Sequence, residues 1–127
     1  MSVEKITDAE WRVMHVVWKS SAAMTSNDVI VEVVPTTGWN PQTVRTLLAR
    51  LVEKKILAAT KEKGILLFTP LVTREASISV HGQSFLERVF EGNAREMLVH
   101  FVRDGAFSQK QIDELRELLN KDLNHDD

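Results

Sequence analysis

The segment from Trp39 to Glu53 constrains the fold of this chain more than any other, because it encodes a helix with two contrasting faces. Asn40 is a favourable helix N-cap, and Pro41 suits the first helical turn, where its missing N–H costs nothing. Apolar residues then recur three and four positions apart and form one stripe suited to burial. The stripe consists of Val44, Leu47, Leu48, Leu51 and Val52. This helix must therefore pack one side against a core and expose the other.

The exposed side of the predicted helix carries amide, hydroxyl and guanidinium groups, which can pair with the base edges and phosphates of DNA. At about 100° per residue, this face consists of Gln42, Thr43, Thr46, Ala49, Arg50 and Glu53, with Arg45 on its flank. Taken alone, the segment fits an ordinary amphipathic surface helix as well as it fits a helix that reads DNA.

Two further helices are predicted before this segment. Thr7-Asp8-Ala9-Glu10 is a capping box and opens a helix that runs to about Lys19. Thr25 or Ser26 caps a second helix, which we expect Pro35 to stop, with residues 36–38 as the turn that follows. The second of these helices, the turn, and the helix after Trp39 with its polar outer face form two short helices joined by a turn. This arrangement is typical of a helix-turn-helix unit.

A β-hairpin is predicted next. Residues 56–61 and 65–70 are two apolar runs around the charged loop Glu62-Lys63-Gly64. A hairpin that directly follows a recognition helix forms the wing of a winged helix. Lys61 and Lys63 near its tip are placed to reach a phosphate or the minor groove. The alternative is a solvated turn that uses lysine for solubility.

From Thr73 onward the pattern is purely helical. Helices are predicted over Ser77–Glu91, Ala94–Asp104 and Gln109–Leu123, and residues 124–127 are expected to form a frayed tail. Three short helices cannot bury so many large apolar groups alone, so we expect this part to pair with a second copy. The residues expected at that interface are Phe85, Val89, Met97, Leu98, Phe101, Ile112, Leu115 and Leu119.

The predicted fold class is therefore mainly α, with a winged helix-turn-helix domain over residues 1–73 and a three-helix dimerisation domain over residues 74–127. The net charge of −2 hides a difference between these parts. Residues 1–73 contain 9 basic and 7 acidic residues, whereas residues 74–127 contain 7 basic and 11 acidic ones. A mildly basic first part can hold a phosphate-binding face. The acidic second part is not expected to touch DNA.

Several classes of protein are disfavoured by what the sequence lacks. The chain has no cysteine, which excludes disulfides, thiolate metal ligation and a cysteine nucleophile, and which fits a cytoplasmic protein. No apolar run is long enough to cross a bilayer, and the N-terminus does not resemble a signal peptide, so no membrane partner is expected. The histidines are scattered without the spacing of a metal site. No phosphate-cradling loop or nucleophile–base pair is apparent, so we expect no cofactor and no enzyme activity.

Several literal residue blocks carry a family resemblance. In the first helix they are Ala9-Glu10-Trp11, Val13-Met14 and Trp18. The most specific block is Trp39-x-Pro41-x-Thr43-Val44-Arg45-Thr46-Leu47-Leu48-x-Arg50-Leu51. Further blocks are Phe68-Thr69-Pro70-Leu71-Val72, Leu98-Val99-His100-Phe101 and the segment Ile112–Leu119. Over nearly its whole length the chain thus resembles the penicillinase-repressor and methicillin-resistance-repressor family (BlaI/MecI type).

The resemblance implies a homodimeric winged-helix repressor that binds palindromic promoter operators of the TACA/TGTA type in double-stranded DNA. It places Gln42, Thr43, Thr46 and Arg50 where the family's third helix meets DNA, with Arg45 beside them. It also assigns the three C-terminal helices to dimerisation.

Two induction devices are known in this family. In β-lactam-responsive members, an activated protease cuts one Asn–Phe bond in the dimerisation domain. The matching bond here is His100–Phe101, with histidine in place of asparagine, which makes such a protease a candidate partner. The copper-responsive branch (CopY type) ends in a C-x-C…C-x-C metal hook, and a chain without cysteine cannot use it.

A second function remains open at the level of sequence, namely a winged-helix module that uses its third helix to bind a partner protein. Salt dependence separates the two, because DNA binding weakens steeply with salt through counterion release, whereas a neutral protein contact need not.

Overall fold

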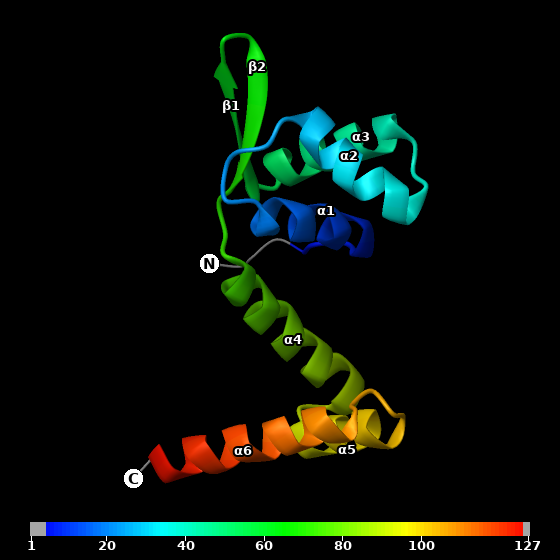
Figure 1. Cartoon of the computed structure of the whole chain (residues 1–127), viewed down its shortest axis with the longest axis vertical. Coiled ribbons are helices and arrows are strands. Elements are labelled where there is room, and N and C mark those ends of the chain that lie inside the picture. Colours follow the sequence, from blue (N-terminus) through cyan, green and yellow to red (C-terminus); the bar gives the residue numbers. More distant parts are fainter. Residues whose placement is uncertain (1–4, 126–127) are drawn as a thin grey trace. The chain divides into compact units, whose positions relative to one another are not determined.

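The computed structural model describes residues 5–125, and the side-chain surroundings of residues 5–121. The chain is mainly helical, with one antiparallel hairpin (Figure 1). Its elements are α1 (Asp8–Lys19), α2 (Ser26–Thr37), α3 (Pro41–Glu53), β1 (Leu57–Glu62), β2 (Ile65–Pro70), α4 (Arg74–Phe90), α5 (Ala94–Arg103) and α6 (Gln109–His125). The predicted mainly α fold class is confirmed.

The chain divides into two compact units, the first ending at His81 and the second beginning at Gly82. This division falls within α4, whereas the domain boundary expected from the sequence, between residues 73 and 74, precedes that helix. The predicted boundary stays a prediction. Within residues 5–125, no helix is both long and apolar enough to span a bilayer.

Local capping residues start the helices of the first unit where the sequence predicts. The Glu10 amide donates to the Thr7 hydroxyl at 3.2 Å, and the Thr7 amide donates to the Glu10 carboxylate at 2.9 Å, so the capping box is complete. Asn40 accepts a hydrogen bond from the Gln42 amide at 2.8 Å, with Pro41 in the first turn of α3. These bonds satisfy amides that have no partner inside the helix.

The core of the first unit lies among α1, α2, α3 and the hairpin. Its fully buried side chains include Val13 and Met14 of α1, Val29 and Val33 of α2, and Leu48 of α3. The other buried apolar residues are Ile6, Val17, Met24, Val44, Leu47, Leu51, Ile56, Leu57 and Phe68. Three helices and a hairpin thus share one apolar centre.

The hairpin is fastened to this core through β2. The Met24 amide donates to the Phe68 carbonyl at 3.1 Å, and the Phe68 amide donates to the Met24 carbonyl at 2.8 Å. The strands pair from Leu57 with Pro70 to Glu62 with Ile65, which leaves Lys63-Gly64 as a two-residue turn. Both turn residues have positive φ, 50° and 80°, as tight hairpin turns with matching twist require.

Three predicted boundaries are wrong. Helix α2 does not stop at Pro35 but continues to Thr37 and ends at left-handed Gly38, so residues 36 and 37 are helical rather than part of a turn. Pro35 is tolerated because it lies in the last turn, and it and Val31 are both exposed. Water can therefore take the place of the missing amide.

Helix α4 begins at Arg74 rather than at Ser77, because the Thr73 hydroxyl accepts a hydrogen bond from the Ala76 amide at 3.1 Å and caps the helix. Helix α6 extends to His125, so residues 124 and 125 of the expected tail are helical. Residues 126 and 127 lie outside the described part of the chain.

A buried ion pair joins the start of α1 to the end of α3. The Glu10 side chain is 1% exposed, and Lys54 Nζ donates to its Oε1 at 2.7 Å and to the Lys5 carbonyl at 2.9 Å. Burial alone would raise the pKa of Glu10, but the hydrogen bonds from Lys54 and Thr7 and the charge of Lys54 outweigh it and hold the pKa below the ordinary value of a glutamate. The ionised carboxylate therefore stabilises the folded state.

We expect Glu10→Gln to lower the free energy of unfolding at pH 7 by about 1–3 kcal/mol, because a buried charge-assisted hydrogen bond is lost. A carboxylate whose folded pKa is depressed contributes stability above its unfolded pKa, and this contribution disappears as the pH falls through the folded pKa. The difference between the two proteins should therefore shrink as the pH falls from the ordinary pKa of a glutamate through the lowered pKa of Glu10. Urea unfolding at fixed protein concentration, followed by tryptophan fluorescence, measures it.

The matched control is Glu53→Gln, which removes an exposed carboxylate one residue before Lys54. It should leave the unfolding free energy nearly unchanged. A Glu10→Gln effect that stays constant from pH 7 to pH 3 would contradict the assignment.

Candidate nucleic-acid interface

The outer face of α3 brings together four of the side chains predicted to read DNA. Gln42, Thr43, Thr46 and Arg50 are all exposed, and with Asn40 and Leu47 they line a shallow hollow of about 380 Å³. The Thr46 hydroxyl donates to the Gln42 carbonyl at 3.0 Å, which fixes its orientation and leaves its oxygen free to accept. The face thus presents amide, hydroxyl and guanidinium groups from successive turns of one helix.

The rotation of this face is set by the opposite side of α3. Val44 and Leu51 are fully buried, and Leu48 is 1% exposed. At the C-terminal end, the Ile56 amide donates to the Leu51 carbonyl at 2.9 Å, and Lys55 takes a positive φ of 63°. The polar groups therefore project from a helix that is packed against the core along one side and capped at both ends.

Arg45 is exposed, as predicted, but it does not line the hollow of the other four side chains. It lies instead beside a second, apolar hollow between α3 and the hairpin, together with Ser26 at the start of α2. Arg45 therefore occupies the flank of the polar face that is nearer to the wing.

The two predicted wing lysines are exposed at the end of the hairpin. Lys63 forms the turn with Gly64, and Lys61 pairs across the hairpin with Leu66. Lys61 also lines a hollow with residues of the α2 N-terminus, among them Asn27. Next to these lysines, Ile65 and Leu66 are 55% and 48% exposed. The sequence analysis did not single out this apolar exposure, because both residues read as ordinary strand positions.

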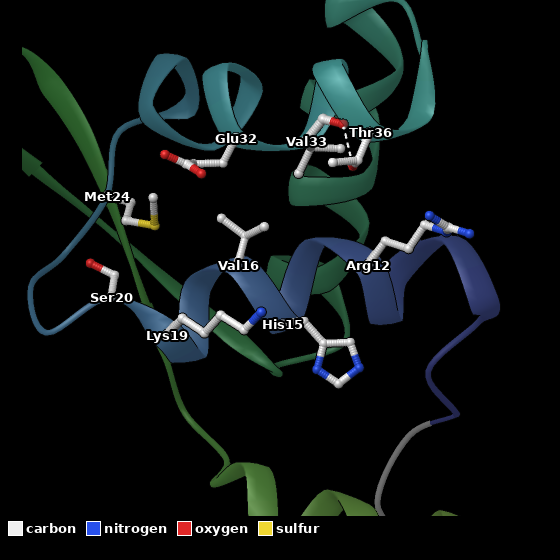
Figure 2. Close-up of a pocket in the computed structure, with 9 residues that line it drawn as sticks. All are labelled: Arg12, His15, Val16, Lys19, Ser20, Met24, Glu32, Val33 and Thr36. Carbon is white, nitrogen blue, oxygen red and sulfur yellow. Dashed lines mark hydrogen bonds between the residues drawn. The ribbon is translucent and has the colours of Figure 1, made fainter. Parts of the chain in front are cut away.

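A further hollow, of about 590 Å³, lies between α1 and α2 (Figure 2). Arg12, His15 and Lys19 of α1 and Glu32 of α2 are among the residues that line it. Burial lowers the pKa of His15, and the charges of Arg74 and Lys19 lower it further. The positive charge of the hollow near neutral pH therefore comes from Arg12 and Lys19 and not from His15. Arg12, His15 and Lys19 share one face of α1, but the hollow also needs Glu32 from α2, and no local sequence pattern joins the two helices.

The second unit has no core of its own in the described part of the chain. Between Gly82 and Lys121 not one side chain is buried. Phe85, Phe90 and Phe101 contact one another, with ring centroids 6.1–6.5 Å apart, but all three keep solvent exposure. Such a helical unit has its apolar surface available for another chain.

Each residue predicted for dimerisation lies on this open apolar surface. Phe85, Val89 and Leu119 are exposed, and the remaining five are half-buried, namely Met97, Leu98, Phe101, Ile112 and Leu115. The structure adds Val102 and Leu118, which are 39% and 56% exposed. Val102 stands four positions after Leu98, and Leu118 stands three positions after Leu115, so both keep the helical spacing of the predicted set.

The candidate cleavage bond, between His100 and Phe101, lies inside α5. His100 is exposed, and its Nε2 is 3.0 Å from a carboxylate oxygen of Asp104 one turn further on. Its use by a protease stays a prediction. No group of three or more potential metal ligands occurs among residues 5–125.

The sequence profile of the Penicillinase repressor family matches residues 6–121. The chain belongs to this family. It is 36% identical over 122 residues to the penicillinase repressor of Bacillus licheniformis, covering 96% of this chain and 94% of that protein. It is 32% identical over 117 residues to the methicillin resistance regulatory protein MecI of Staphylococcus aureus (strain N315), covering 92% and 94%. The family resemblance found in the sequence is confirmed.

Solved structures of the family match the first unit. The DNA-binding domain of the repressor BlaI in solution has a TM-score of 0.52 and 38% identity, covering 57% of this chain and 88% of that one. The monomeric form of Bacillus licheniformis BlaI, in complex with the blaP half-operator, matches with a TM-score of 0.52 and 38% identity, covering 58% and 89%. The predicted winged-helix character of the first unit is thereby confirmed.

Proposed function

We propose that this chain is a homodimeric transcriptional repressor that binds a palindromic operator of the TACA/TGTA type through α3 and the hairpin. One observation carries the proposal: the polar face of α3 lies opposite a stripe of which Val44, Leu47, Leu48 and Leu51 are buried, in a chain that matches known repressors over most of its length. The role is binding without catalysis. Its place is the cytoplasm, where bacterial promoters lie.

The exposed side chains divide into two roles. Gln42, Thr43, Thr46 and Arg50 share the outer face of α3 and suit the major groove, where amides pair with adenine and guanidinium groups pair with guanine. Arg45, Lys61 and Lys63 carry their charges toward and along the wing, where contact with phosphate fixes the orientation of the protein without reading sequence.

Dimerisation supplies the affinity that one winged helix lacks. Two copies place their recognition helices in successive major grooves, about 10 bp apart or at a longer helical spacing. Once the first helix is bound, the second contact becomes intramolecular, which raises affinity without any new type of contact. The open apolar surface of the second unit is the part of the chain suited to hold the copies together.

The alternative, a module that uses α3 to bind a partner protein, is not favoured. The similar proteins are named a penicillinase repressor and a methicillin resistance regulatory protein, and the structural match with BlaI includes a half-operator complex.

Proteolytic induction at His100–Phe101 is a further part of the proposal. A protease takes an extended stretch of backbone, and this bond lies inside a helix that is capped by Asn93. Cleavage therefore requires α5 to open locally first.

We expect Arg50→Ala to weaken binding to operator DNA by about 1–3 kcal/mol, through loss of a base or phosphate contact. Fluorescence anisotropy at several salt concentrations separates the two, because loss of a phosphate contact lowers the salt slope by about one. Arg12→Ala is the control, since Arg12 lines the hollow between α1 and α2 instead. Unchanged affinity in Arg50→Ala would remove Arg50 from the interface.

We expect Leu115→Asp and Leu119→Asp to yield monomers and to lose operator binding, because a carboxylate in a desolvated apolar interface is costly. Leu119 is 48% exposed in the single chain, so its substitution removes little packing within one copy and acts on the contact between copies. Sedimentation equilibrium measures the association. Leu71→Asp, at a 57% exposed leucine of the first unit, should remain a dimer. A Leu119→Asp protein that still sediments as a dimer would show that the interface lies elsewhere.

A further inference from the structure

An apolar hollow of about 360 Å³ lies between the recognition helix α3 and the hairpin. Leu48 and Val52 of α3 form one wall, and Ala59 and Phe68 of the hairpin form another. Leu48 and Phe68 belong to the buried core, so the floor of the hollow is held in place. Its volume lies within the range of small-molecule sites, about 300–1,000 Å³.

The hollow has few polar groups along its lining, and the one charged group is a cation. Arg45 and Ser26 are the residues with polar side chains along its lining. Among the ion pairs of the described residues, Arg45 takes part in none, so its guanidinium is available. A guanidinium binds a carboxylate through two parallel hydrogen bonds. An apolar cavity with one such group fits a ligand with an apolar body and one carboxylate.

We propose that this hollow binds a small carboxylate with an apolar body, such as 1-naphthoate, with the apolar body against Val52, Leu66 and Phe68 and the carboxylate on Arg45. The hydroxyl of Ser26 is the second polar group for the ligand. Leu66, 48% exposed at the same hollow, is then covered by the bound ring.

The regulatory part of this inference rests on the proposed function. Arg45 cannot bind a ligand carboxylate and a DNA phosphate with the same two N–H groups. The hollow also lies between the two elements proposed to contact DNA, so a bound ring occupies space between helix and wing. Ligand and operator therefore oppose each other, and by linkage each weakens the binding of the other by the same factor.

The first experiment needs no DNA. Titration of the full chain with 1-naphthoate, followed by amide chemical shifts, should saturate and should shift residues around Ala59, Leu66 and Phe68. The neutral analogue 1-naphthalenemethanol should bind at least tenfold more weakly, because it cannot pair with Arg45. No saturable binding, equal binding of the alcohol, or shifts centred on another surface would overturn the proposal.

Two substitutions test the position of the site. Ala59→Leu fills the hollow from an exposed strand position and should reduce naphthoate affinity at least tenfold. Thr60→Leu adds a similar side chain at the next position of β1, whose side chain points to the opposite face of the hairpin, and should leave the affinity unchanged. Both variants are first checked for unaltered thermal unfolding. Equal affinity of Ala59→Leu and the unaltered chain would place the ligand elsewhere and overturn the proposal.

The second experiment repeats an operator titration with saturating naphthoate. Addition of naphthoate should lower the apparent affinity of the unaltered chain for DNA several-fold. The same addition should leave the affinity of the Ala59→Leu variant for DNA unchanged. Naphthoate that binds but leaves the DNA affinity unchanged would overturn the regulatory part. A chain that binds no operator even without naphthoate would instead refute the proposed repressor function, while the shift titration would still decide the ligand site.

Discussion

Burial of one side of α3 is the interaction on which the rest of the structure depends. Each residue of a helix is turned by about 100° from the one before it, so Val44, Leu48 and Leu51 in the core fix where every other side chain of α3 points. Each fully buried leucine or valine contributes about 1.5–3 kcal/mol. A helix held by several such residues is fixed in its rotation about its own axis and in its distance from the core. Gln42 and Arg50 are consequently presented in a defined arrangement before any DNA is bound.

The second unit follows a different physical logic. With no buried side chain between Gly82 and Lys121, its helices hold too little apolar contact to be stable alone. In the proposed dimer, association and folding of this unit are coupled, so its stability rises with protein concentration. Operator occupancy then depends on the same association. Any event that opens α5, such as cleavage beside Phe101, acts on DNA binding through the dimer and not through α3.

Local signals explain why much of the fold is predictable from the sequence. The Thr7–Glu10 capping box, Asn40 with Pro41, and the stripe from Val44 to Leu51 each act within a few residues, and each appears in the structure as expected. The end of α2 was predicted too early, at Pro35, because a proline is tolerated in an exposed last turn. Thr73 is a local capping residue that marks the start of α4, whereas the apolar spacing becomes regular only further along the helix.

Features built from distant segments are not predictable in this way. Glu10 and Lys54 meet across 44 positions, and no local pattern marks Lys54 as the partner. The hollow beside Arg45 needs α3, the hairpin and the start of α2 in their final places. The sequence could place Arg45 on the flank of the recognition face, but not beside the apolar residues of the hairpin that line the same hollow.

The most direct test of the account is a titration of the purified chain onto duplex DNA from its own upstream promoter, at two salt concentrations, with a scrambled duplex as control. Native mass spectrometry of the complex gives the stoichiometry. The account predicts two chains per promoter duplex, clear preference over the scrambled duplex, and affinity that falls steeply with salt. Equal and weak binding to both duplexes, or one chain per duplex at saturation, would contradict it.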